Sequence, residues 1–411
     1  MKLLIHEPNN KGHFLHSARL IAEAAIACGA TTEISVRRDA PSTPEFKLHM
    51  GPILAKLAAV NAFDLPAGGT LTAVSAASGR ACIEIAARRG AEHILVPAAD
   101  GVAPMLAARS WGGLRRILPK GAELEAGLIR PRFAHVGHMG VRRAKMALVR
   151  WAISRAPVGA LRIADFPAYE RMKGMAWARR QRLLAVPEPC EPTRLFTRGE
   201  ARAFLGLPTA GRLVVAPGEI SSRKRPVELA TAFAGAGAPD ARLLFAGPCA
   251  DGLHEQLRER FRREIGEGRI IVMNRLLTDE ELDAAIAAAD VVAAVYSGHP
   301  GPSGIVDRAM MMDRPVLAHN YGWSQYMVRR FKLGWTTDPD SAGMYADAVQ
   351  TALLSAADFR PSATVGWLKS FFSMENFKRH WTMRIRERMG LPPEEMVLWE
   401  DAPDTARQPQ A

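Results

Sequence analysis

The chain has 411 residues, of which 48% are hydrophobic and 23% are charged, and its formal net charge is +12. This composition is too apolar for a disordered protein, and the length exceeds what one hydrophobic core usually serves, so two domains are predicted. The sequence contains no run of about 18 apolar residues, so no membrane-spanning helix is predicted.

The excess of positive charge predicts an anionic partner, such as nucleic acid, an acidic membrane surface or a phosphorylated small molecule. The four cysteines form no C-x-x-C pair, so neither a zinc site nor a disulfide framework is predicted. The opening residues lack the apolar core and the cleavage site of a signal peptide. We therefore expect a cytoplasmic protein, either soluble or peripheral to the inner membrane.

The first half of the chain alternates between strand-like and helix-like segments. Strands are predicted at 2–7, 32–37 and 93–100, and helices at 14–28 and 75–89. Strands that alternate with helices indicate an α/β domain with a parallel sheet.

The segment 141–155 is basic, with Trp151 and other apolar residues between its cations. Such a segment suits an anionic membrane surface, and the alternative is a linker helix packed between domains. His135 and His138 precede it, but no further metal ligands accompany them in the sequence.

Four prolines within 185–194 indicate a linker between two domains. A helix predicted near 371–389 follows the second set of strands and is expected to cross back onto the first domain. The predicted division of the chain is 1–188, 189–370, the crossing helix at 371–390, and a flexible tail at 391–411.

The second half shows the clearer pattern, because its apolar runs are short and contain little polar alternation. Such runs are typical of parallel strands that are buried on both faces, and helix-like segments separate them. The expected fold is α/β and doubly wound. The predicted strands are 212–218, 241–247, 269–274, 290–297 and 314–320, and the predicted helices are 226–235, 253–266, 279–289 and 303–312.

Two loops of this half are candidate anion sites, because ligands of open parallel sheets bind at the carboxyl ends of the strands. One loop carries Gly218, Arg223 and Lys224 after the first strand. The other places Ser303 and Gly304 at the start of a helix, where N–H groups can bind phosphate. The alternatives are a solvated basic loop and an ordinary capped helix. Because both candidate loops follow strands of the same predicted sheet, the ligand that they favour is a diphosphate.

These motifs, with "GHPGPSGIVDRAMMMDRPVLAHNYG" and the later "RRFKLGW", resemble bacterial glycosyltransferases of GT-B architecture, in particular the group 1, family 4-like enzymes. The resemblance covers most of 212–345, and the opening "MKLLIHEPNNKGHFLHSARLIAEAA" is similar to the start of the family. It implies two facing Rossmann-like, doubly wound domains. The first would bind a glycan or lipid-linked acceptor and the second a nucleotide-diphosphate sugar, and transfer would retain the anomeric configuration.

The resemblance also implies residue roles. Lys224, helped by Arg223, would neutralise the departing pyrophosphate, with Gly218 beside them and Ser303 and Gly304 holding phosphate. On the first domain, Gly12 and His13 would line the cleft.

Two residues are candidates for catalysis. His13 has a side chain that titrates near neutrality, which suits an acid or base, and a structural loop role is the alternative. Asp100 ends a predicted strand at the same edge of the sheet. Its carboxylate suits an acceptor hydroxyl or a helix cap.

The sequence departs from the family at the glutamate pair that contacts the donor. Pro300 and Arg308 stand at those two positions, and Glu219 replaces the usual arginine after Gly218. Arg308 with Ser303 is expected to form a variant donor site, and His299 is expected beside the sugar unless it is a surface residue.

The departures leave two other functions open: a non-catalytic GT-B scaffold in polysaccharide assembly, and a nucleotide-sugar epimerase. No cofactor and no obligatory metal are expected, because "DPD" at 338–340 fits a turn and helix start better than a metal motif. No nucleic-acid partner is expected, because no recognition motif accompanies the charge.

Overall fold

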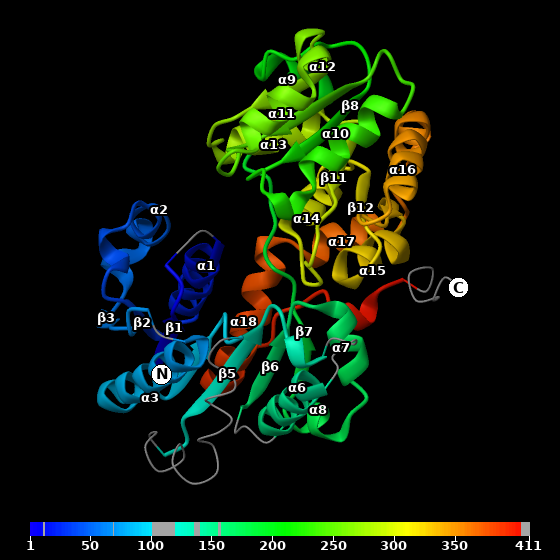
Figure 1. Ribbon diagram of the computed structural model, residues 1–411. Coiled ribbons are helices and arrows are strands. Elements are labelled where there is room, and N and C mark those ends of the chain that lie inside the picture. The colour runs from blue at the N-terminus through cyan, green and yellow to red at the C-terminus, as the bar shows by residue number, and fades with distance from the viewer. Residues whose placement is uncertain (11–12, 69, 101–119, 135–139, 155–157, 404–411) are drawn as a thin grey trace. The chain divides into compact units, whose positions relative to one another are not determined.

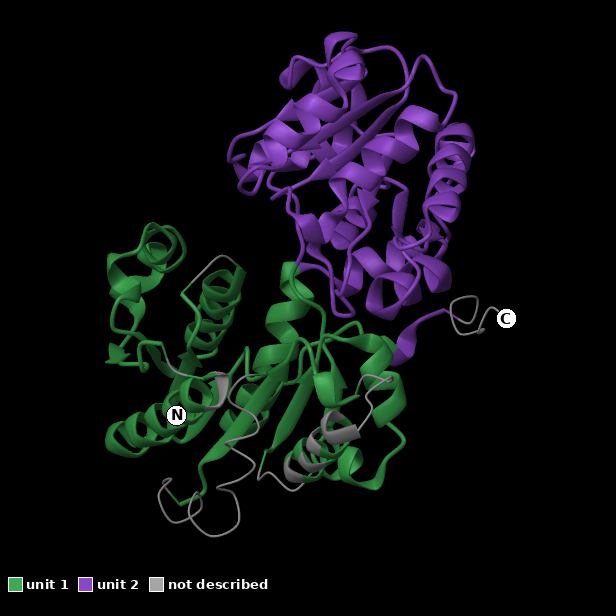
Figure 2. Cartoon of the chain, viewed as in Figure 1, with its two compact units in different colours: residues 1–189, 374–399 green, residues 190–373, 400–411 purple. Residues whose placement is uncertain are grey.

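The computed structural model describes residues 1–10, 13–68, 70–100, 120–134, 140–154 and 158–403. It divides into two compact units (Figure 2). The first comprises Met1–Pro189 and Met374–Trp399, and the second comprises Cys190–Ser373 and the residues from Glu400 onward. Among the described residues, no helix is both long and apolar enough to cross a membrane.

The first unit is built on a seven-stranded sheet in the order β3-β2-β1-β4-β5-β6-β7 (Figure 1). All of its pairings are parallel. The strands are β1 (Lys2–Glu7), β2 (Thr31–Arg37), β3 (Ala59–Phe63), β4 (His93–Val96), β5 (Glu123–Leu128), β6 (Ala160–Ile163) and β7 (Leu183–Ala185), and the helices are α1 (His13–Ala27), α2 (Pro44–Met50), α3 (Leu71–Arg89), α6 (Gly140–Ile153), α7 (Phe166–Met172), α8 (Ala176–Arg180) and α18 (Met374–Met389).

Helix α18 comes from the far end of the chain and completes the core of the first unit. Its residues Phe377, Trp381 and Ile385 recur every four positions, so they lie on one face of the helix. That face is buried in the same cluster as Leu15 of α1 and Ile5 of β1. The C-terminal helix therefore packs on the first unit, as the sequence predicts.

The second unit holds a six-stranded parallel sheet in the order β10-β9-β8-β11-β12-β13. Strand order reverses between β8 and β11, and ligands of doubly wound sheets bind outside such a switch point. The strands are β8 (Leu213–Pro217), β9 (Arg242–Ala246), β10 (Ile270–Met273), β11 (Val291–Ala294), β12 (Val316–His319) and β13 (Gly334–Thr337), and the helices are α9 (Arg198–Phe204), α10 (Pro226–Gly235), α11 (Leu253–Arg260), α12 (Arg262–Gly266), α13 (Asp279–Ala288), α14 (Gly304–Met311), α15 (Gly322–Phe331), α16 (Ala342–Ser355) and α17 (Val365–Phe371).

The predicted elements differ from the observed ones in several places, and β3, β7 and β13 are among the strands that were not predicted. The helix predicted over 253–266 is interrupted at the buried Phe261, whose φ of −117° and ψ of 34° leave the helical region. Helix α3 begins four residues earlier than predicted, because the Thr70 hydroxyl accepts a hydrogen bond from the Ala73 N–H and caps it. Strands β5 and β6 were not predicted, because buried charges interrupt their apolar runs.

Candidate functional site

The loop after β8 brings a lysine back to the end of its own strand. Lys224 Nζ donates a hydrogen bond to the Pro217 carbonyl. A Cβ atom at Gly218 would lie 3.2 Å from that nitrogen, and Gly218 has φ +77°, a conformation that glycine adopts without strain. Burial, with Arg223 nearby, lowers the pKa of Lys224 to about 7. Near neutral pH part of the Lys224 population is therefore the uncharged amine, which gains a proton when an anion binds beside it.

Tyr296 joins this loop to the second predicted anion loop. The Arg223 guanidinium lies over the Tyr296 ring, 4.9 Å from its centroid. The Arg223 carbonyl accepts a 2.7 Å hydrogen bond from the Ser297 N–H, and the Ser303 hydroxyl donates to the Tyr296 hydroxyl at 3.3 Å. The structure thus brings the two loops together beside the switch point of the sheet.

Helix α14 begins at this place. Ser303 occupies the capping position, but its hydroxyl makes no capping hydrogen bond and turns to Tyr296 instead. Gly304 is exposed, with open space where a Cβ would lie. The first N–H groups of a helix carry partial positive charge, so a phosphate can approach the backbone here. Asp307 is buried in the same turn.

His299 is buried within its own loop. Its Nε2 lies 2.9 Å from the Pro302 carbonyl, and its backbone N–H donates to the Tyr321 hydroxyl at 3.3 Å. The His299 carbonyl lies 3.0 Å from Nε2 of the buried His319. These contacts hold the loop in shape around the imidazole, which is only 8% exposed.

Arg308 forms a structural ion pair. Its Nη1 lies 2.5 Å from the fully buried carboxylate of Asp283, and its Nη2 lies 3.4 Å from Asp279. Asp283 also accepts hydrogen bonds from the Thr193 N–H at 2.6 Å and the Thr193 hydroxyl at 2.7 Å. Arg308 therefore links α14 to α13 and to the segment at Thr193.

Pro300, the other residue at a family glutamate position, packs against the start of α15. Its carbonyl accepts a 2.8 Å hydrogen bond from the Trp323 N–H. Gly322 has φ +64°, and a Cβ there would lie 2.5 Å from the Pro300 carbonyl oxygen. This close approach explains the glycine.

Three candidate residues belong to the first unit. Gly12 lies outside the described residues. His13 begins α1, and its Nε2 is 3.7 Å from the Glu188 carboxylate. Asp100 accepts backbone hydrogen bonds from Ile129 at 2.8 Å and Arg130 at 2.9 Å, and burial raises its pKa to about 6. Asp100 thus ties the loop after β4 to the end of β5.

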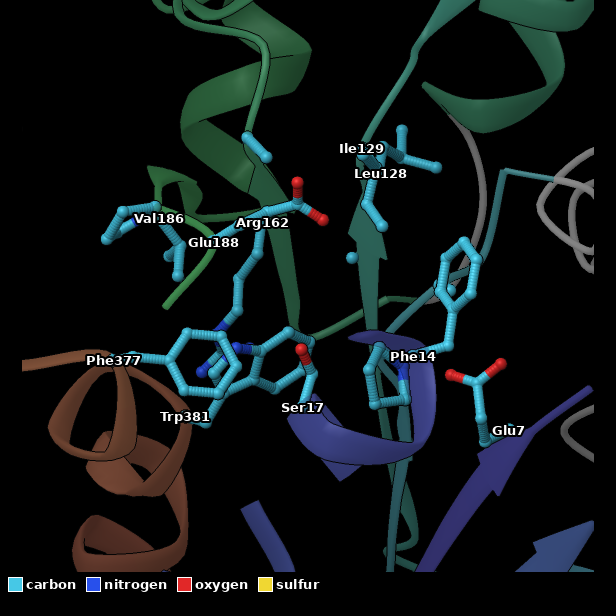
Figure 3. Close-up of a pocket in the computed structure, with 15 residues that line it drawn as sticks. Glu7, Phe14, Ser17, Leu128, Ile129, Arg162, Val186, Glu188, Phe377 and Trp381 are labelled. Atoms are coloured by element: carbon cyan, nitrogen blue, oxygen red, sulfur yellow. The ribbon is translucent and has the colours of Figure 1, made fainter. Parts of the chain in front are cut away.

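A pocket opens within the first unit, at the carboxyl ends of β1, β4 and β5 (Figure 3). The sequence analysis missed its main polar residue, Glu7, whose only signal is a carboxylate at the end of an apolar strand. The residues that line the pocket are Glu7, Phe14, Ser17, Pro97, Ala98, Gly127, Leu128, Ile129, Arg162, Ala164, Val186, Pro187, Glu188, Phe377 and Trp381.

The Arg162 side chain in this pocket is held by buried partners. It pairs with Glu125, which also lies 2.5 Å from Nε2 of His93. Its Nη2 donates to the His380 carbonyl at 2.9 Å, and its guanidinium lies over the Trp381 ring at 4.5 Å. The positive charge is therefore compensated inside the protein. Among the described residues, no group of three or more histidine, cysteine or acidic side chains is arranged to hold a metal ion.

Residues 211–355 match the family model described as glycosyl transferases group 1. No protein of curated function matches the chain in sequence.

Many solved structures share the fold. Sucrose-phosphate synthase from Thermosynechococcus elongatus is similar with a TM-score of 0.66 and 19% identity, over 95% of this chain and 99% of that one. HepE from Anabaena, solved with UDP, is similar with a TM-score of 0.64 and 15% identity, over 95% of this chain and 100% of that one. A putative UDP-N-acetylglucosamine 2-epimerase from Listeria monocytogenes is similar with a TM-score of 0.59 and 12% identity, over 96% of this chain and 99% of that one.

The identities to these structures are low, so the likeness establishes the fold, which is the predicted pair of Rossmann-like domains. The family match covers the loop with Lys224 and the start of α14. Residues 211–355 therefore resemble group 1 glycosyl transferases, and the chain as a whole shares the two-domain fold of these solved structures.

Proposed function

We propose that the second unit binds a nucleotide-diphosphate sugar, with the diphosphate between Lys224 and the start of α14. The observation that carries this proposal is the contact of Tyr296 with both Arg223 and Ser303, because it places both anion loops at one sheet edge. HepE, which shares the fold, is solved with UDP and with UDP-glucose. The nucleotide base and the sugar of the donor are left open.

The reaction transfers the sugar to a hydroxyl group of the acceptor. The bond between the anomeric carbon and the diphosphate oxygen breaks, and a bond from that carbon to the acceptor oxygen forms. The acceptor proton passes to the departing diphosphate, and we propose that the configuration is retained. Charge develops on the diphosphate as it leaves, so a protonated Lys224 and oriented N–H groups stabilise the transition state.

The proposed acceptor is a glycan or a lipid-linked sugar. Helix α6 supports an acceptor at a membrane surface, since Arg143, Arg150 and Trp151 are exposed on it and the Trp151 side chain is 50% exposed. A basic helix with an exposed tryptophan is attracted to anionic lipid headgroups. Co-sedimentation with anionic vesicles tests this part of the proposal. The Trp151→Ala variant should bind the vesicles more weakly than the wild type.

Calorimetric titration with UDP, GDP and ADP tests the donor site. One of the three is expected to bind, and Lys224→Ala is expected to weaken that binding about tenfold or more, since hydrogen bonds to charged groups contribute roughly 1.5–3 kcal/mol. Lys332→Ala is the matched control, because Lys332 is exposed in the same unit at the end of α15. No binding of any nucleotide would refute the proposal.

A non-catalytic scaffold is the second candidate. It is favoured by the structural roles of Arg308 and Pro300 at the positions where the family carries glutamates. Such a protein would bind the nucleotide but release no diphosphate from the donor when acceptors are offered. An epimerase would instead convert the nucleotide sugar without any acceptor, which NMR of the sugar detects.

A further inference from the structure

The pocket of the first unit combines aromatic walls with a few polar groups. Phe14, Phe377 and Trp381 supply flat apolar surfaces. In Figure 3, Ser17 lies between Trp381 and Phe14, and Glu7 lies at the edge of the pocket on the side of Phe14. Aromatic faces pack against the C–H faces of a ring, while carboxyl and hydroxyl groups form hydrogen bonds with its polar substituents. The lining therefore suits a ring with apolar faces and a hydroxylated edge.

The Glu7 carboxyl group has one oxygen in use and one without a partner. Oε1 accepts hydrogen bonds from the backbone N–H and the side-chain Nδ2 of Asn9, both at 2.8 Å. Oε2 is buried and has no hydrogen-bond partner among the described residues. The residue is only 1% exposed. A buried oxygen without a partner is costly, so a ligand that hydrogen-bonds to it gains affinity.

The charges around the pocket disfavour an anionic ligand. Glu188 lines it with a carboxylate, which repels a phosphate, and the charge of Arg162 is already compensated by Glu125. Burial raises the pKa of Glu7 to about 8, so at neutral pH its carboxyl group is mainly uncharged. An ammonium group would therefore gain little from Glu7.

We propose that this pocket binds a neutral, hydroxyl-bearing ring and that Glu7 is the residue that selects it, through a hydrogen bond from its free oxygen to a ring hydroxyl. This inference rests on the proposed sugar transfer, in which the ring belongs to the acceptor. It assigns the acceptor a neutral sugar at its receiving end. A phosphate on that sugar is excluded.

Ligand-observed NMR with the full chain and saturating UDP tests the inference. The probes are the neutral hexoses glucose, galactose and mannose, with glucosamine and glucose 6-phosphate as the charged counterparts. At least one neutral hexose is expected to bind, and Glu7→Gln is expected to weaken it about tenfold. Glu84→Gln is the matched control, because Glu84 is exposed on α3.

A preference for glucosamine or glucose 6-phosphate overturns the inference, and so does the absence of binding by every neutral hexose. Equal hexose affinity in wild type and Glu7→Gln overturns the role of Glu7. If Glu7→Gln fails to fold, Phe14→Ala is used in its place. Phe14 is half-buried, and its substitution removes one aromatic wall of the pocket, so hexose affinity should fall by a similar factor.

Titration of the same proteins with UDP separates this inference from the donor proposal. Loss of hexose binding with UDP binding intact concerns this pocket alone, whereas loss of UDP binding in wild type concerns the donor proposal.

Discussion

Nucleotide binding should be accompanied by the uptake of a proton at Lys224. In the empty protein its pKa is about 7, because burial and the neighbouring Arg223 disfavour the charged form. At pH 8 roughly a tenth of the molecules therefore carry the ammonium charge. A diphosphate beside the nitrogen favours the charged form and raises the pKa. Binding at pH 8 should then take up close to one proton, roughly 0.9 if the pKa in the complex exceeds 9.

The direction of the pH dependence follows from the same shift. Above pH 7 each complex must first acquire a proton, so nucleotide affinity should fall as pH rises, by at most about tenfold per pH unit. The nucleotide itself contributes little at pH 8, since the second pKa of a terminal phosphate is about 6. The decline should end near the pKa of Lys224 in the complex.

Calorimetry at pH 8 in two buffers with different ionisation enthalpies measures the number of protons taken up. Lys224→Arg is the informative variant, because arginine stays charged at this pH. It should bind the nucleotide with almost no proton uptake. No uptake by the wild type, or the same uptake by Lys224→Ala, would refute the role given to this lysine.

Three further substitutions test the structural part of the account. Arg308→Ala leaves the buried Asp283 without its ion-pair partner and should destabilise the protein by about 3 kcal/mol in chemical denaturation. Gly322→Ala places a Cβ against the Pro300 backbone at positive φ, so it should lower stability by about 1–2 kcal/mol and weaken nucleotide binding by shifting the loop. Trp381→Ala should cost about 3–5 kcal/mol, and an unchanged melting temperature would contradict the packing of α18 on the first unit.

The strands that sequence reasoning located are those with uninterrupted apolar runs. β8, β9 and β11 have such runs, because both faces of a central parallel strand are covered. β5 and β6 contain Glu125 and Arg162, whose burial is possible because they pair with each other and with His93 and the His380 carbonyl. Because the paired residues are far apart in the chain, no local sequence pattern predicts that these two charges are buried.

The two candidate anion loops could be predicted from the sequence because ligands of parallel sheets bind at the carboxyl ends of the strands. In the structure, Tyr296 contacts both of these loops. The sequence analysis did not identify Tyr296, because its role depends on a contact across the sheet edge. Arg308 also shows the limit of local reasoning, since it stands at a family glutamate position while its ion-pair partner, Asp283, lies on another helix. The donor role of Arg308 and the catalytic roles of His13 and Asp100 stay predictions.

A crystal structure of the chain with its preferred nucleoside diphosphate tests the central claim most directly. We expect the diphosphate to lie within hydrogen-bond distance of Lys224 Nζ and of the first N–H groups of α14, at Gly304. A nucleotide bound with its phosphates away from both groups would contradict it.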